Sequence, residues 1–378
     1  MATDNFDHQG PKYLTNLDWE NHEHQRIVAA CLVKAAYVLE GDRREGRSGE
    51  DQLAPPWWEF FGFELISTLV NLESSLSSFS IGAVFRLKAA SGTSPFAPAM
   101  VIAVRGTIDH HDWGVNVDTL LGRGRQRHSC RIVMEKAESL VREHGMESNL
   151  WLCGHSLGAT VATFVGDQMA KKGCFFTTFL FNPPYILNRR SKDGFIQKLD
   201  DIMQAAGGLV GALMVGNVGF AGANLYAVAK ILHDMDKEKK EQLQHFDNMK
   251  AGDQAALAKN LHDKERQDQL QQFDNLNKWD PRVYVNPKDY LCTRYIKYFK
   301  NKKMKGSPNK LPKRLASATL FINWDKPGDR CLRSKVAHSI MQCFVKPEDT
   351  YRLFKEAHSI MQWWKPGLRV EAKRYVMA

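Results

Sequence analysis

The sequence predicts an α/β fold built on a mostly parallel sheet. Short apolar segments alternate with amphipathic helical segments along much of the chain, which is typical of strands connected in parallel through helices. One apolar segment runs directly into a Gly-x-Ser-x-Gly turn, and a helical pattern of small residues follows that turn. The composition, 43% hydrophobic and 25% charged over 378 residues, allows a large core.

The first part of the chain contributes one helix and two strands to this prediction. Residues 19–42 have an amphipathic pattern that predicts a helix. Its apolar positions near one face are Ile27, Cys31, Leu32, Ala35 and Leu39. Residues 81–90 and 99–107 are apolar runs joined by a loop of Ser, Gly and Pro, which predicts two strands.

Helices and strands alternate in the middle of the chain. A helix is expected over 129–144, with Ser129 capping its start and Gly145 its end. A second helix is expected over 157–172 and ends at Gly173. The strands expected in this part of the chain and beyond it are 149–153, 175–184 and 282–287.

Residues 190–280 interrupt this alternation and predict a helical insertion. Within it, 203–229 is uncharged and long enough to span a bilayer, but its polar residues favour a buried helical pair or a lid. These polar residues are Gln204, Asn217 and Asn224. A charged helical region follows, with an imperfect repeat at 241–250 and 268–278. We therefore expect one domain, 1–378, whose insertion is a lid or a membrane-docking element.

Ser156 lies between Gly154 and Gly158, where the strand 149–153 meets the next helix. This pattern is a nucleophile elbow, in which small flanking residues let strand and helix approach while the serine occupies a sharp turn. An ordinary serine in a structural turn is the alternative, which the matching strand and helix disfavour. At the helix start, the Leu157 N–H would stabilise an oxyanion beside Ser156.

Thr107 is the candidate for a second oxyanion donor. It ends the predicted strand 99–107 upstream of the elbow, and both its backbone N–H and its hydroxyl suit this role. Capping of the strand end is the alternative interpretation.

Several motifs support a resemblance to a known family. They are "VRGT" (104–107) followed by Asp112 and Trp113, "WWEFF" (57–61), "GHSLGA" (154–159), "FNPP" (181–184), "YVNPKD" (284–289) and a late "AH…QWW" (357–364). Together they resemble the fungal-type triacylglycerol lipases, lipase class 3, and more closely a plant esterase/lipase-like branch of that group. The resemblance runs from about 20 to 370 and matches least over the insertion. It implies an α/β-hydrolase fold and the hydrolysis of carboxylic esters, with lipid acyl esters as the class.

Asp289 is the candidate acid. In hydrolases of this fold the chain order is Ser, then Asp or Glu, then His. Asp289 follows the strand 282–287, at the end where catalytic loops lie, and it matches the "NPKD" of the family. A turn-forming aspartate is the alternative. Asp280 precedes the strand and would lie at its wrong end, while Asp325 and Asp329, in a Pro/Gly loop, are weaker candidates.

His358 is the candidate base. Of thirteen histidines, His338 and His358 follow Asp289, each in a copy of "AHSIMQ". The resemblance places the histidine before "QWW", which selects His358 and leaves His338 as the runner-up. Related proteins often have a second histidine where this chain has Met361. His155, next to the serine, is expected to orient the elbow.

These residues predict acyl transfer in two steps through an acyl-enzyme, with no metal or organic cofactor. A small-molecule or lipid ester is the expected substrate, and the oligomeric state is left open. Two alternatives remain. One is an acyltransferase that uses the same triad. The other is a lipase-like scaffold or signalling protein with dispensable catalysis, whose partner surface would be the charged helical region 235–278.

Charge and cysteine content limit the surroundings of the protein. The formal net charge is +10, and the basic loop 297–314 is expected to be solvated, with contact to anionic lipid head groups as the alternative. No groove-reading pattern accompanies it, so nucleic acid is not an expected partner. Seven cysteines without CxxC spacing fit a reducing compartment. Since no apolar signal segment opens the chain, we expect a cytoplasmic protein, peripheral to a membrane at most, and not a secreted one.

Overall fold

The computed structural model describes residues 4–71, 79–88, 94–107, 123–146, 149–185, 267–289, 291–301, 315, 317–323 and 354–376. The chain divides into two compact units: one joins Met1–Asn188 to Gln272–Ala378, and the other is Arg189–Gln271. Of the predicted insertion, the helical residues 267–278 are described, whereas 203–229 and the repeat at 241–250 lie outside the described residues. The role of the insertion as a lid therefore stays a prediction.

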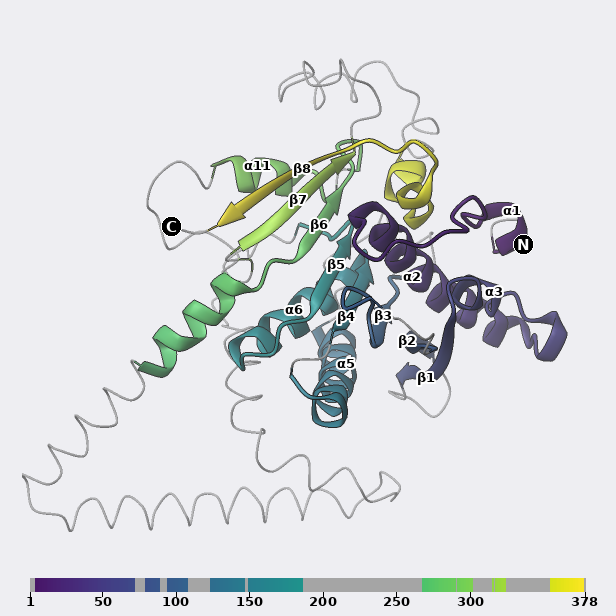
Figure 1. The fold of residues 1–378 in the computed structure, drawn as a ribbon, viewed down its shortest axis with the longest axis horizontal. Coiled ribbons are helices and arrows are strands. Elements are labelled where there is room, and N and C mark those ends of the chain that lie inside the picture. Colours follow the sequence, from purple (N-terminus) through teal and green to yellow (C-terminus); the bar gives the residue numbers. More distant parts are fainter. Residues whose placement is uncertain are drawn as a thin grey trace, which may run out of the picture. The chain divides into compact units, whose positions relative to one another are not determined.

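An eight-stranded sheet, with its strands in chain order, forms the centre of the first unit (Figure 1). The strands are β1 (Phe63–Asn71), β2 (Phe79–Leu87), β3 (Met100–Val104), β4 (Leu150–His155), β5 (Thr177–Phe181), β6 (Arg282–Val285), β7 (Ser317–Asn323) and β8 (Val370–Val376). Strands β3 to β7 pair in parallel, while β1–β2, β2–β3 and β7–β8 pair antiparallel. The predicted fold class, a mostly parallel α/β-hydrolase sheet flanked by helices, is confirmed.

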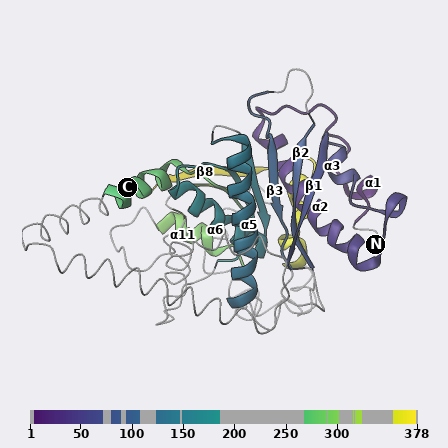
Figure 2. The same ribbon diagram turned by 90° about the horizontal axis from the view of Figure 1, so that it is seen from below.

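Helices cover both faces of the sheet (Figure 2). The long helix α2 (His22–Glu45) packs on one face with α3 (Pro56–Glu59), and α5 (Arg123–His144) and α6 (Leu157–Lys171) lie on the other. The remaining described elements are α1 (Phe6–Gln9), η1 (Gly49–Asp51), α11 (Arg294–Asn301) and η4 (Ile360–Trp364). None of the helices in the described ranges is long and apolar enough to cross a membrane.

Side chains alternate between the two faces along the strands, as period-2 geometry requires. Ala103 and Cys153 point into the cluster beneath α2, together with Phe179 and Trp151. Their neighbours along the chain, including Ile102 and Leu152, are fully buried toward the other face. Burial on both faces explains why these strands are almost continuously apolar in sequence.

Some predicted boundaries and elements differ from the structure. Helix α5 begins at Arg123, so Ser129 lies inside the helix and the predicted cap there is wrong. A capping preference is worth only about 1 kcal/mol, and the Arg and Gln residues before Ser129 are good helix formers. Gly145, in contrast, ends the helix with a φ of 83° as expected. Strands β1, β7 and β8 were not predicted from the sequence.

Candidate active site

Ser156 occupies a strained turn between β4 and α6. Its φ of 54° and ψ of −124° place a non-glycine residue in a region that costs energy to occupy. A Cβ on Gly154 would lie 2.4 Å from the Gly158 carbonyl oxygen, and one on Gly158 would lie 2.3 Å from that of Val104. The flanking glycines are therefore required by close backbone contacts. The Ser156 hydroxyl is buried and has no hydrogen-bond partner among the described residues.

The two predicted oxyanion donors belong to segments that adjoin this turn. Leu157 is the first residue of α6, and the first N–H groups of a helix have no acceptor within the helix. Thr107 follows Gly106, on which a Cβ would come within 2.9 Å of the Ser156 Cβ. The structure thus brings the chain segment of Thr107 against Ser156. The roles of Leu157 and Thr107 as donors stay predictions.

Asp289 lies in the turn after β6 and is completely buried. Its Oδ1 accepts the backbone N–H of Leu291 at 3.0 Å. Its Oδ2 accepts the Asn182 amide at 2.6 Å and the Cys292 thiol at 3.2 Å, and lies 2.7 Å from Nδ1 of His358. These partners present donors to the carboxyl group, which therefore acts as an acceptor at both oxygens.

His358 ends a short helical segment, residues 354–358, and is buried. The Phe354 ring stacks on its imidazole at 5.4 Å between ring centroids, with the planes inclined by 24°. Because Asp289 accepts at Nδ1, that nitrogen carries the proton and the lone pair remains on Nε2. This is the tautomer that a general base needs.

The competing candidates are placed differently or lie outside the described part of the chain. Asp280 precedes β6, where it accepts from the Thr319 hydroxyl and pairs with Arg374 at 3.0 Å. Asp280 therefore lies at the end of β6 away from Asp289 and makes structural contacts there. Asp325, Asp329 and His338 lie outside the described residues, so the choice of His358 over His338 stays a prediction.

Asn182 is the main site residue that the sequence analysis did not identify. It follows β5 with a φ of 46° and is completely buried. Its amide nitrogen donates to Asp289 and to the Ala357 carbonyl at 3.1 Å, and its oxygen accepts the indole N–H of Trp363 at 2.7 Å. One side chain thus joins Asp289 to the segment that carries His358. The motif "FNPP" was the signal, because an asparagine tolerates a left-handed backbone after a strand.

Cys292 is the second unexpected neighbour of Asp289. Burial, and then the adjacent Asp289 carboxyl group, raise the pKa of the Cys292 thiol well above its usual value. The thiol therefore stays protonated and donates to the carboxylate. The five cysteines in the described ranges are buried, and no cluster of metal-ligating side chains occurs there.

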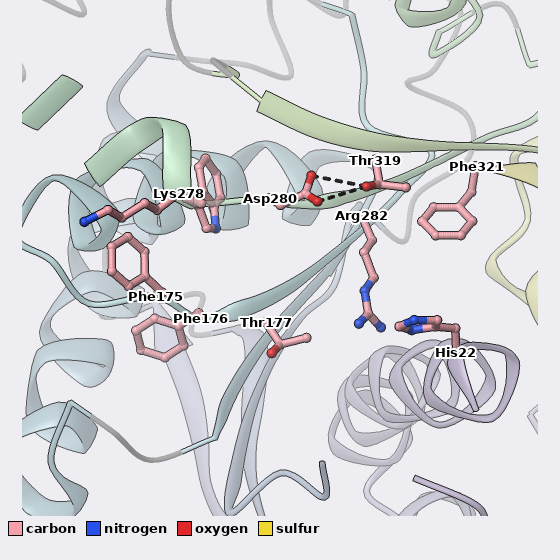
Figure 3. Close-up of a pocket in the computed structure, with 10 residues that line it drawn as sticks. His22, Phe175, Phe176, Thr177, Lys278, Asp280, Arg282, Thr319 and Phe321 are labelled. Carbon is pink, nitrogen blue, oxygen red and sulfur yellow. Dashed lines mark hydrogen bonds between the residues drawn. The ribbon is translucent and has the colours of Figure 1, made fainter. Parts of the chain in front are cut away.

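A cavity of about 370 Å³ opens at the other edge of the parallel strands (Figure 3). Its lining includes Phe175 and Thr177 at the start of β5 and Asp280 and Arg282 at the start of β6. In Figure 3 the Arg282 guanidinium points toward His22 of α2. Ser156 follows the opposite end of β4, so this cavity does not belong to the Ser156 site.

Comparisons with known proteins identify the family of this chain. The model of the class 3 lipase family matches residues 101–204, which include β3, β4 and the Ser156 turn. A protein of Arabidopsis thaliana named as a GDSL esterase/lipase is 30% identical over 389 residues, covering 98% of this chain and 97% of the relative. No solved structure matches the chain at a significant level. The chain therefore belongs to the class 3 lipase family, in the branch that includes this plant esterase/lipase.

Proposed function

We propose that this protein is a serine hydrolase that cleaves carboxylic esters, with lipid acyl esters as its substrate class, through Ser156, His358 and Asp289. One observation carries the proposal. His358 pairs with the buried Asp289 at 2.7 Å, and its ring lies 5.0 Å from that of His155, the residue before a strained serine at a strand-to-helix turn. The family membership and the name of the plant relative support ester hydrolysis as the reaction class.

The first half of the proposed reaction forms the acyl-enzyme. The Ser156 oxygen attacks the ester carbonyl carbon while Nε2 of His358 takes the hydroxyl proton. The oxyanion that forms is stabilised by the N–H groups of Leu157 and Thr107. His358 then gives its proton to the alcohol oxygen as the carbon–oxygen bond breaks, which leaves the acyl group on Ser156.

The second half releases the acid. A water molecule gives a proton to the same Nε2 and attacks the acyl carbon, and the proton returns to Ser156 as the serine ester bond breaks. Asp289 keeps the imidazole in the required tautomer and stabilises its charged form in both halves. Asn182 and Cys292 hold the carboxylate in place by donating to Oδ2.

Labelling with a fluorophosphonate, read by intact mass, tests this function. The wild type should gain one adduct, and Ser156→Ala should gain none while keeping the wild-type circular dichroism. Ser139→Ala, which removes a helix-surface hydroxyl bonded to Glu143, is the matched control and should label normally. Asp289→Asn should slow ester turnover by about 10³–10⁴-fold, because a neutral amide neither fixes the imidazole tautomer nor stabilises its charged form. Folded wild-type protein that takes up no adduct would refute the proposal.

Acyl transfer to an alcohol and a scaffold role remain the alternatives. The first uses the same acyl-enzyme and differs only in the acceptor. Turnover in increasing glycerol separates the two, since a transferase would form the new ester at the expense of the free acid. For the scaffold role, most of the partner surface expected at 235–278 lies outside the described residues.

A further inference from the structure

The hydroxyl of Tyr37 connects two parts of the candidate site that are far apart in sequence. Tyr37 lies on α2, and its oxygen accepts the backbone N–H of Gly106 at 2.7 Å. The same oxygen lies 2.8 Å from Nδ1 of His155, whose ring packs edge-on against the phenol. Burial raises the pKa of Tyr37 far above its usual value, so the phenol remains a neutral donor.

The partners of His155 determine the direction of these hydrogen bonds. Its Nε2 lies 2.7 Å from the backbone carbonyl oxygen of His358. A carbonyl only accepts, so Nε2 carries the proton and Nδ1 of the neutral ring accepts from Tyr37. Gly106 N–H therefore donates to Tyr37, Tyr37 O–H donates to His155, and His155 N–H donates to His358. We call these four residues the Tyr37 relay.

The peptide that precedes Thr107 is held from its other side. Nη1 of the buried Arg105 donates to the Gly106 carbonyl oxygen at 2.6 Å, and Nε donates to the Ser80 carbonyl oxygen at 2.6 Å. In a trans peptide the N–H points away from the carbonyl of the same unit. Arg105 thus directs the Thr107 N–H to the side opposite the Arg105 guanidinium. Tyr37 fixes the preceding peptide unit, which ends in the Gly106 N–H.

Building on the proposed roles of Ser156 and His358, we propose that Tyr37 is a positioning residue that couples the oxyanion-binding peptide to the base. Its hydroxyl sets the Gly106 backbone, which lies against Ser156, and through His155 it holds the backbone of His358. The hydroxyl oxygen of Tyr37 thereby fixes the position of the oxyanion-hole donor relative to the proton acceptor, Nε2 of His358. This also assigns a function to the histidine of the "GHSLG" motif.

Tyr37→Phe removes that oxygen and keeps the ring. We expect kcat for p-nitrophenyl butyrate to fall by about 10- to 100-fold with KM within twofold, since a displacement of about 1 Å costs rates of this order. Tyr13→Phe is the matched control, because Tyr13 also donates to a backbone carbonyl of the base segment, that of Trp364, at 2.6 Å. Because Tyr13 is half exposed, its substitution should lower thermal stability less than Tyr37→Phe does, and it should leave kcat unchanged.

Substitutions at His155 test the order of the relay. His155→Gln keeps an N–H that reaches the His358 carbonyl and should retain more activity than His155→Leu, which keeps none. The double variant Tyr37→Phe/His155→Leu should be no more than twofold slower than the slower single variant, because both break one chain of contacts. Losses that multiply, or a Tyr37→Phe kcat within twofold of wild type, would overturn the inference.

The labelling experiment separates this inference from the proposed function. A wild type that takes up no fluorophosphonate and hydrolyses no ester would refute the roles of Ser156 and His358, whatever the Tyr37 variants do. A wild type that is labelled and active, with Tyr37→Phe equal to it, would refute the positioning role alone.

Discussion

Asn182→Ala is expected to damage both the stability and the activity of the protein. The substitution removes a donor to the buried Asp289 carboxylate, and a hydrogen bond to a charged group is worth about 1.5–3 kcal/mol. It also leaves the indole N–H of the fully buried Trp363 without its 2.7 Å acceptor, at a cost of about 1–3 kcal/mol. Alanine at a φ of 46° adds strain that asparagine tolerates better. We therefore expect the free energy of unfolding to fall by about 3–5 kcal/mol.

Urea unfolding and ester turnover measure the two effects. The kcat of the remaining folded protein should fall at least about tenfold, because Asn182 also holds the carbonyl of Ala357, next to the proposed base His358. Asn149→Ala is the matched control: its amide donates to the Phe96 and Ala97 carbonyls at the opposite edge of the sheet. It should cost about 1 kcal/mol and leave kcat unchanged. An Asn182→Ala protein that loses less than about 1 kcal/mol, or keeps wild-type kcat, would refute the reasoning.

Two further predictions concern stability. Burial of Glu40 raises its pKa, but hydrogen bonds from Arg43, Arg44 and the Ser80 N–H outweigh this and lower the pKa to about 2. This pKa change corresponds to a stabilising contribution of about 3 kcal/mol, which is complete above the unfolded pKa and is lost as the pH falls from about 4.5 to about 2. The difference in urea stability between wild type and Glu40→Gln should therefore close over this pH range, and a difference that stays constant would contradict this. The buried Tyr284 hydroxyl bonds to none of the described residues, and burial raises its pKa to about 12. Tyr284→Phe should therefore increase the free energy of unfolding by about 1 kcal/mol while keeping its ring stacking, and a loss of that size would show that the hydroxyl has a partner.

Features that depend on neighbours in the chain could be predicted from the sequence. The Ser156 turn is the clearest case, because the contact between Gly154 and Gly158 is made within five consecutive residues. Strands β2 to β6 could be predicted because most of their side chains are buried and their segments are therefore largely apolar, although β7 is similarly buried and was not predicted. The edge strand β8 has mostly exposed side chains and carries no such pattern, and so it was missed. The position of Asp289 after β6 was found from the order of residues, since catalytic loops follow the ends of parallel strands.

Contacts between distant segments were decided by the tertiary structure. Asn182 meets Asp289, and Tyr37 meets both Gly106 and His155, only because the sheet brings the ends of β3, β4 and β5 together beneath α2. The tautomers of His155 and His358 depend on acceptors supplied by other segments. By itself, the sequence determined which residues could carry the chemistry, because backbone sterics and burial leave a local pattern. The packing of the sheet decided which side chains hold them in place, because hydrogen bonds form across space wherever partners meet.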